Sequence, residues 1–337
     1  MARGELLRKL FLSHMRGADE EFRAIALEIV GEEQQKKNNQ LAKDLLRILE
    51  NGTQTPAFAK LPDNVGSLPR DRERQTLLVD VRHSDRTFSD ILLKKDSCDS
   101  IHRVIDEYRK AEILGTHGLV PKTKLLFCGP PGCGKTLCAE VLSRELGLPL
   151  LYTRFDAVVS SFLGETAANL RKVFDYASSG QWVVLFDEFD AIGKARDDAS
   201  EHGEIKRVIN SFLQLLDNFQ ARSIVIAATN HEHLLDPALW RRFDEIVFFP
   251  KPSATDVRNL IEMKLRSFPH KGIDVRGAAT RLKGMSHADI EHICFDAIKS
   301  CILDDKGELD SRAFEASVQR QKGRIAVTTR AARKKPK

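Results

Sequence analysis

The sequence of 337 residues predicts an α/β fold, in which a parallel sheet with crossover helices follows a helical N-terminal region and precedes a small all-helical subdomain. From about residue 86, short runs of apolar residues alternate with helical patterns, as in strands that are covered on both faces. After Pro250-Lys251-Pro252 no such run occurs, and helical spacing continues to about residue 319. The expected strands are Lys124–Cys128, Pro149–Tyr152, Trp182–Phe186, Ser223–Ala227 and Ile246–Phe249.

The composition excludes two classes of protein. With 42% hydrophobic and 30% charged residues, the chain is too apolar to be disordered over most of its length. Its apolar runs are all shorter than the roughly 18 residues of a membrane-spanning helix, so we expect no membrane partner. Charged residues interrupt the N-terminus, unlike in a signal peptide, and the six cysteines lack disulfide or zinc spacing. We therefore expect a cytoplasmic location.

The sequence divides into five expected regions. Apolar residues at helical spacing, such as Phe22, Ile25 and Ile29, predict helices near the N-terminus, and the Pro- and Gly-rich stretch after Gly52 predicts a linker. A short apolar run, Thr76–Val81, is expected to form an edge strand. The regions are 1–52, the helical N-terminal region; 53–85, the linker; 86–250, the large α/β subdomain; 251–319, the helical lid; and 320–337, a basic tail expected to be disordered.

The net charge of +5 comes from that tail. Residues 320–337 contain eight Lys and Arg and no acidic residue, whereas residues 1–85 carry 14 basic and 14 acidic side chains. Residues 86–319 therefore have a net charge of −3, which argues against the continuous basic surface of a DNA-binding domain. The tail is expected either to contact nucleic acid or another anionic partner, or to be a solvated extension.

A phosphate-binding motif follows the first expected strand. Residues 129–136 match G-x-x-x-x-G-K-[ST] between an apolar strand and a helical pattern. The glycines allow backbone N–H groups to surround a polyphosphate at the positive end of the following helix. Lys135 is expected to reach the β- and γ-phosphates of ATP, and the Thr136 hydroxyl to bind Mg²⁺. The candidate nucleotide-binding residues are Gly129, Pro130, Pro131, Gly132, Cys133, Gly134, Lys135 and Thr136.

Two carboxylates end the apolar strand Trp182–Phe186. Asp187 is expected to bind Mg²⁺ through water, and Glu188 to polarise the water that attacks the phosphate. An acidic junction after a strand is common by itself. Asp187 lies 52 residues after Lys135, and this position favours a functional role for the pair, because the phosphate-binding motif and the acidic strand end are independent signals that agree.

Together these residues resemble the AAA family of ATPases over residues 86–303. The resemblance implies a P-loop NTPase fold, ATP hydrolysis with Mg²⁺, and assembly into a homo-oligomeric ring, expected to be a hexamer. Ala228-Thr229-Asn230 resembles the family's sensor 1, in which Asn230 would orient the water or the γ-phosphate. The segment Gly284–Ile290 resembles the G-x-S-x-A-D lid segment of the AAA clade, with His287 where glycine is usual. Within it, Ser286 is expected to be a helix N-cap.

The segment Leu235–Asp244 resembles the family's arginine-finger region, whose arginines enter the nucleotide site of the next subunit. Two residues separate the fingers in many relatives, but Arg241 and Arg242 are adjacent here. Arg242 is the favoured finger because it directly precedes Phe-Asp, as in the family pattern. The alternative is that both arginines only form salt bridges at a subunit edge.

The segment around Phe162, Leu163 and Gly164 resembles the loop that AAA protein remodelers project into the central pore of the ring. Phe162 and Leu163 would then grip a polypeptide, and Gly164 would allow the loop to move. The alternative is that Phe162 is buried beneath the loop. Residues 196–203 would form a second pore loop, or an ordinary surface loop.

These expectations favour an ATPase ring that remodels, unfolds or threads a protein substrate, with the N-terminal region as its adaptor. The organisation resembles small stand-alone bacterial AAA ATPases with a helical N-terminal region. Because the sequence contains neither HExxH nor GxSxG, a separate peptidase or effector is an expected partner. Two other classes stay open: a nucleic-acid-associated regulator that uses the basic tail, and an ATP-dependent assembly scaffold with slow turnover.

Overall fold

The computed structural model of the chain describes residues 6, 9, 13, 19–35, 67–154, 158, 163–189, 202–220, 222–231 and 240–333. The chain forms two compact units, residues 1–60 and residues 61–337, which are described separately. In the first unit, helix α2 spans Asp19–Gln35 and buries Ile25, Ala26 and Val30, as the apolar spacing predicts. Leu41, Leu45, Ile48 and Leu49 repeat the helical spacing and predict a further helix, but they lie outside the described residues.

The second unit is built on a six-stranded sheet in the order β1-β3-β4-β5-β2-β6. Its strands are β1 (Val79–Arg82), β2 (Lys124–Cys128), β3 (Leu150–Thr153), β4 (Val183–Phe186), β5 (Ile224–Thr229) and β6 (Glu245–Phe248). Strands β2 to β6 pair in parallel, which confirms the expected parallel sheet for five strands. Strand β1 is an antiparallel edge strand on β3. The edge strand expected at Thr76–Val81 is therefore confirmed, and the sheet begins inside residues 53–85, the segment expected to be a linker with a short strand.

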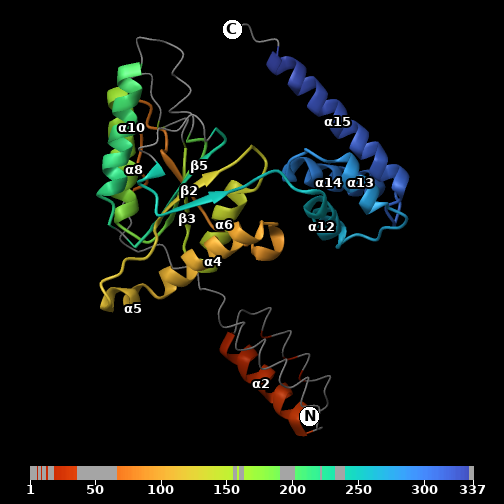
Figure 1. Cartoon of the computed structure of the whole chain (residues 1–337). Coiled ribbons are helices and arrows are strands. Elements are labelled where there is room, and N and C mark those ends of the chain that lie inside the picture. The colour runs from red at the N-terminus through yellow and green to blue at the C-terminus, as the bar shows by residue number, and fades with distance from the viewer. Residues whose placement is uncertain are drawn as a thin grey trace. The chain divides into compact units, whose positions relative to one another are not determined.

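Helices cover both faces of this sheet (Figure 1). Side chains alternate across the strands, so that Leu126 belongs to one apolar core and its neighbours Leu125 and Phe127 belong to the other. The first core contains aromatic rings of α8 and α10, among them Phe174 and Phe212. The second core contains residues of α4 and α6. The helices are η1 (Phe88–Asp90), α4 (Lys95–Arg109), α5 (Ala111–Thr116), α6 (Lys135–Leu146), α8 (Leu163–Ser178) and α10 (His202–Asp217).

Residues 67–78, which lead into β1, pack against α8. Asn169 of α8 donates its Nδ2 to Asp71 Oδ2 at 2.8 Å, and both side chains are buried. Lys172 donates to the carbonyl oxygen of Arg70 at 3.0 Å. Asp71 also caps its own turn by accepting from the N–H of Arg74 at 2.7 Å. This segment is thus part of the large subdomain, not a free linker.

The lid is a separate helical subdomain with its own apolar core. Pro250 and Pro252 mark the end of the sheet subdomain, because proline interrupts further strand pairing. The first lid helix starts at a capping box, in which Ser253 and Asp256 satisfy each other's backbone N–H groups. The lid helices are α12 (Ala254–Leu265), α13 (Val275–Arg281), α14 (His287–Leu303) and α15 (Ser311–Arg333).

Residues 320–333 of the basic tail, which was expected to be disordered, continue helix α15 to Arg333. Hydrogen bonds hold its first turns to the lid: Arg320 donates to Asp296 at 2.8 Å and to Ser300 at 3.0 Å, and Gln321 donates to Asp289 at 2.9 Å. Ala, Arg, Gln and Lys are good helix formers, and the one proline of the segment, Pro336, lies beyond the helix. The lid therefore extends past residue 319, its expected end.

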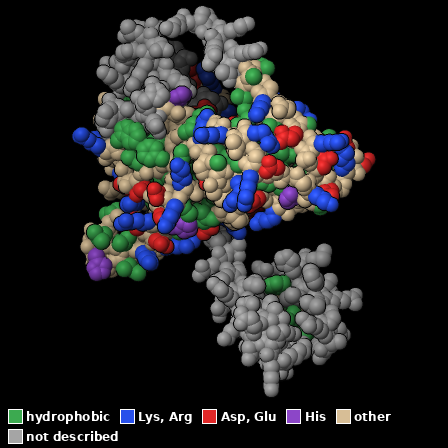
Figure 2. All heavy atoms as spheres, turned by 45° about the vertical axis from the view of Figure 1, so that its right-hand side comes forward, with side chains coloured by type: hydrophobic (Ala, Val, Ile, Leu, Met, Phe, Trp, Pro, Cys, Tyr) green, Lys and Arg blue, Asp and Glu red, His purple; other side chains and the backbone are tan. Residues whose placement is uncertain are grey.

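The surface of the second unit is mixed in charge. Figure 2 shows Lys and Arg side chains interspersed with Asp and Glu over one face. No continuous basic surface covers this face, in line with the net charge of −3 over residues 86–319. Of the helices that the structure describes, none combines the length and the apolar composition needed to cross a membrane.

Candidate active site

The phosphate loop, residues 129–136, connects β2 to α6 along a path that requires its glycines. Gly129, Gly132 and Gly134 have φ angles of 148°, 71° and 97°, which residues with a Cβ rarely adopt. A Cβ on Gly129 would lie 2.2 Å from the carbonyl oxygen of Phe249, which follows β6. The glycines thus allow the loop to pass close to the backbone and to enter α6, whose unpaired N-terminal N–H groups attract anions.

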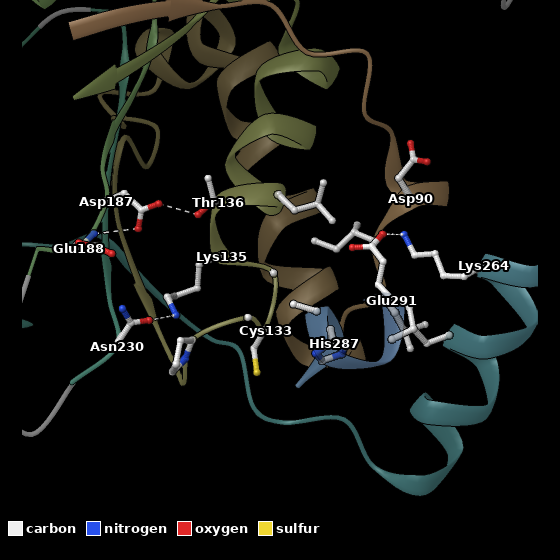
Figure 3. Close-up of a pocket in the computed structure, with 18 residues that line it drawn as sticks. Asp90, Cys133, Lys135, Thr136, Asp187, Glu188, Asn230, Lys264, His287 and Glu291 are labelled. Carbon is white, nitrogen blue, oxygen red and sulfur yellow. Dashed lines mark hydrogen bonds and ion pairs between the residues drawn. The ribbon is translucent and has the colours of Figure 1, made fainter. Parts of the chain in front are cut away.

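Lys135 is the first residue of α6, and only 6% of it is exposed. Its Nζ donates to the carbonyl oxygens of Gly129 and Pro130 at 2.6 and 3.0 Å, and to Asn230 Oδ1 at 2.8 Å (Figure 3). Asn230 directly follows β5, which is the neighbour of β2 in the sheet. The strand order thus brings together two residues expected to act on the same phosphate, and it holds the ammonium group beside the loop.

Thr136 and Asp187 form a pair that could hold a divalent cation. The Thr136 hydroxyl donates to Asp187 Oδ2 at 2.7 Å. Hydroxyl and carboxylate oxygens suit Mg²⁺, which commonly keeps water ligands and shares phosphate oxygens of its substrate. The described residues contain no group of three His, Cys, Asp or Glu that could hold a metal by itself. The pair therefore fits an Mg²⁺ ion that binds together with a nucleotide.

Glu188 occupies an unusual backbone position after β4. Its φ is +52°, a region that costs energy for a residue with a Cβ and is often found at functional sites. Its N–H donates to Asp187 Oδ1 at 2.9 Å, and the next N–H, of Phe189, donates to Ala228 O at 2.9 Å. The Phe189 ring is buried 4.6 Å from the ring of Phe212. This anchored turn leaves the Glu188 side chain exposed at the cavity.

A cavity of about 340 Å³ extends from the phosphate loop to the lid (Figure 3). Lys135 and Asp187 line one end, and Asp90, Lys264 and Glu291 line the other. The sequence did not single out these last three residues. They come from η1, α12 and α14, so no local pattern connects them.

The lid contacts the phosphate loop directly. The backbone N–H of Ala288 donates to the carbonyl oxygen of Gly132 at 2.9 Å. A Cβ on Gly132 would lie 2.8 Å from Ser286 Oγ, so the glycine is also needed for this approach. Ser286 and Asp289 form the capping box of α14, which confirms the expected N-cap.

Two side chains lie where the loop and the lid meet. His287 stands in the position where the family usually has glycine, and it lines the cavity. Burial lowers the pKa of His287, although Asp256 acts in the opposite direction, so the imidazole is neutral at neutral pH. Burial raises the pKa of the Cys133 thiol, which therefore packs as a small apolar group.

Two comparisons with known proteins find related sequences. Residues 125–251 match the family model described as "ATPase family associated with various cellular activities (AAA)". Over 332 residues, the chain is 41% identical to a protein of Sinorhizobium fredii (strain NBRC 101917 / NGR234) named "Uncharacterized AAA family ATPase y4kL". The match covers 98% of this chain and 99% of that protein. The chain belongs to the AAA family of ATPases. The expected family and the expected α/β P-loop NTPase fold are confirmed.

The two candidate finger arginines of this AAA ATPase lie away from its own cavity. Arg242 Nε forms an ion pair with Asp217 Oδ2 at 2.8 Å, at the end of α10. Arg241 is exposed and makes no hydrogen bond or ion pair with any other residue that the structure describes. Residues 235–239 of the expected finger segment lie outside the described residues.

The candidate pore loop lies partly outside the described residues. Phe162 is among those that are not described, as are residues 190–201, which contain most of the second candidate loop. Helix α8 begins at Leu163, so the backbone of Leu163 and Gly164 forms the first turn of this helix. The expected freedom of Gly164 would therefore require α8 to unwind at its start.

Proposed function

We propose that this AAA ATPase hydrolyses ATP within a ring-shaped homo-oligomer, a hexamer, and uses the energy to remodel, unfold or thread a protein substrate. The observation that carries the catalytic part is the cavity that joins Lys135, Thr136, Asp187, Glu188 and Asn230. These residues supply the binding, orienting and water-activating groups that phosphoryl transfer to water needs.

Each side chain has a specific role in the proposed reaction. Lys135 and the N–H groups of the phosphate loop bind the β- and γ-phosphates, and Thr136 and Asp187 hold Mg²⁺, Asp187 through water. When bound, Mg²⁺ supplies positive charge that stabilises the phosphate oxygens. Glu188 accepts a hydrogen bond from the attacking water and polarises it, because its carboxylate is exposed to the cavity and held by an anchored turn. Asn230 orients the water or the γ-phosphate.

A neighbouring subunit supplies the arginine finger. Neither Arg241 nor Arg242 lines the cavity of its own chain, so their positions support action on a second copy. The family pattern favours Arg242 as the finger, but the geometry favours Arg241. Arg242 is bound to Asp217, whereas Arg241 is exposed without a partner among the described residues. An arginine finger stabilises charge in the transition state and so raises the hydrolysis rate by about 10³- to 10⁵-fold. Hydrolysis would therefore depend on assembly.

The coupling to a protein substrate rests on the resemblance of residues 162–164 to a pore loop. In the proposed ring, Phe162 and Leu163 grip the polypeptide at the start of α8. The N-terminal unit acts as the adaptor, and the protein works in the cytoplasm, with a separate peptidase or effector as partner.

Steady-state ATP hydrolysis tests this function. An unfolded protein should stimulate the wild-type rate, and the Phe162→Ala variant should keep basal hydrolysis but lose the stimulation. The Glu188→Gln variant should bind ATP, assemble and retain bound substrate, which affinity capture followed by mass spectrometry would identify. Unstimulated, slow turnover with intact Glu188 would instead support an assembly scaffold.

The basic end of α15 favours a second candidate, a nucleic-acid-associated ATPase. Residues 320–337 carry eight basic and no acidic residues. Deleting this whole segment would damage the lid, because Arg320 and Gln321 bind Asp296 and Asp289. Replacing Lys334, Lys335 and Lys337 by Gln leaves these contacts intact. Salt-dependent DNA binding that this variant loses, together with DNA-stimulated hydrolysis, would favour the second candidate.

A further inference from the structure

The two ends of the cavity differ in charge. The phosphate-loop end presents the Lys135 ammonium group beside the N-terminus of α6, which favours anions. The opposite end presents two carboxylates, Asp90 and Glu291, and one ammonium group, Lys264 (Figure 3). A nucleotide whose phosphates occupy the loop must place its nucleoside at this second end.

Two lid helices each present one face to this end. Leu260 and Lys264 are four residues apart on α12, and His287 and Glu291 are four residues apart on α14. Lys264 Nζ forms an ion pair with Glu291 Oε1 at 2.5 Å, and the side chain of Lys264 is only 13% exposed. This pair therefore fixes the position of the Glu291 carboxylate. Its second oxygen, Oε2, has no hydrogen-bonding partner in the described part of the chain.

The other groups at this end explain what the carboxylate can do. Ile91, Leu92 and Leu260 provide apolar surface for the faces of a base. Asp90 Oδ2 already accepts the N–H of Thr87 at 2.9 Å, and this hydrogen bond lowers the pKa of Asp90. Asp90 Oδ1 and Glu291 Oε2 both lack a hydrogen-bonding partner among the described residues, but of the two carboxylates only Glu291 forms an ion pair with the largely buried Lys264 ammonium group.

A carboxylate oxygen accepts hydrogen bonds and repels other acceptors. The donors that a nucleoside offers are its ribose hydroxyls and, in adenosine, the amino group of the base. Guanosine and inosine replace that amino group by a carbonyl oxygen, which is an acceptor.

We infer that Glu291 is a specificity-determining residue of the nucleotide site: its carboxylate, positioned by Lys264, accepts a hydrogen bond from a donor of the nucleoside, either a ribose hydroxyl or the adenine amino group. The inference rests on the proposed nucleotide binding and deepens it. Lys264 is a positioning residue in this arrangement, because it acts through Glu291.

Calorimetric titration of the full-length chain with nucleoside diphosphates tests the inference without hydrolysis. The ligands are ADP, 2′-deoxy-ADP, 3′-deoxy-ADP and purine riboside diphosphate, each of the last three lacking one donor. The analogue that lacks the donor read by Glu291 should bind about 10-fold more weakly than ADP, as expected for a lost hydrogen bond to a charged group. This series needs no variant, so it does not depend on the folding of a mutant.

The Glu291→Gln variant then tests whether Glu291 causes the difference in affinity between ADP and the weaker-binding analogue. It should weaken ADP binding while leaving the affinity for the discriminated analogue nearly unchanged, so that the two ligands bind alike. Glu262→Gln is the matched control, because Glu262 is an exposed α12 carboxylate that pairs with Arg258 and does not line the cavity. It should keep the wild-type preference.

Three results would overturn the inference: equal binding of all four ligands to the wild type, an equal loss for all four in Glu291→Gln, or a preference that this variant retains. An equal loss would mean that the ion pair only supports lid packing. Failure of nucleotide binding itself would look different, because wild type would then bind ADP no better than Lys135→Ala does.

Discussion

Ala288 donates its backbone N–H to the carbonyl oxygen of Gly132 at 2.9 Å, so the first turn of lid helix α14 is hydrogen-bonded to the phosphate loop. The same glycine has a φ of +71° and leaves no room for a side chain beside Ser286. A nucleotide that contacts the loop can therefore influence the lid through this backbone contact. This relationship gives the first prediction.

Gly132→Ala should separate the lid from the loop. Its Cβ would lie 2.8 Å from Ser286 Oγ and 3.1 Å from Ala288 Cβ, so the lid has to shift. We expect ADP affinity, measured by calorimetry, to fall by about 10-fold or more, since a buried hydrogen bond and close packing are lost together. Gly284→Ala is the control: Gly284 has a similar φ of +88° but nothing within 4 Å of the added Cβ. Equal effects of both variants would attribute the loss to backbone strain instead of lid contact.

Lys135 and Asn230 should separate binding from hydrolysis. Lys135→Ala removes the ammonium group beside the loop and should weaken ADP binding by at least about 10- to 100-fold, the range for charge-assisted contacts. Asn230→Ala should leave ADP affinity nearly unchanged and lower the hydrolysis rate by about 100-fold, as for other groups that act in the transition state. The exposed Lys283, replaced by Ala, is the control for loss of a lysine. Unchanged ADP binding by Lys135→Ala would contradict the role given to the phosphate loop.

Arg241 and Arg242 should have different effects on hydrolysis. Arg241→Ala should reduce the rate of the assembled protein by about 10³-fold without weakening ADP binding, if Arg241 is the finger. Arg242→Ala should have the same small effect on thermal stability as Asp217→Asn, since each removes one exposed ion pair worth about 1 kcal/mol or less. The reverse pattern would assign the finger to Arg242.

Asp289 should make lid stability depend on pH. Burial alone would raise the pKa of Asp289, but hydrogen bonds from Ser286 and Gln321 outweigh it and hold the pKa below its usual value. The ionised carboxylate therefore stabilises the folded chain above about pH 4, and this contribution is lost as the pH falls through the lowered pKa. Asp289→Ala should destabilise by about 1 to 2 kcal/mol at pH 7, with loss of the capping box.

Thermal unfolding between pH 7 and pH 3.5 checks this prediction. The difference in midpoint between wild type and Asp289→Ala should shrink below about pH 4. Glu262→Ala removes an exposed lid carboxylate and should change the midpoint little at any pH. A difference for Asp289→Ala that does not vary with pH would contradict the electrostatic explanation.

The sequence predicted the fold where local pattern and tertiary structure coincide. Strand β2 has the bounds expected from its apolar run, because a strand buried on both faces must be apolar throughout. The pairing of β1 could not be predicted, because its partner β3 is distant in the sequence and four residues carry little register information. Charge misled the interpretation of the tail, whose residues favour a helix once Gln321 and Arg320 fix its start.

In the candidate site too, the sequence predicted the residues of local motifs but not those that only the tertiary structure brings together. The phosphate loop and the Asp187-Glu188 pair are contiguous motifs, and the structure brings them together with Asn230. Lys264 and Glu291 belong to different lid helices, and neither lies in a motif. Only the packing of α12 on α14 places them opposite the phosphate loop. The residues that we propose to contact the nucleoside were therefore beyond sequence reasoning, whereas the residues that we propose to bind phosphate were not.

The central claim is that an ATP site of one chain is completed by arginines of another. Mixing two inactive variants tests it: Glu188→Gln keeps both arginines, and the double variant Arg241→Ala/Arg242→Ala keeps Glu188. In a randomly mixed ring, about one site in four would combine an intact Glu188 with intact neighbouring arginines. We predict that each variant alone is nearly inactive and that the mixture hydrolyses ATP at a substantial fraction of the wild-type rate. A mixture as inactive as its two components would contradict the account.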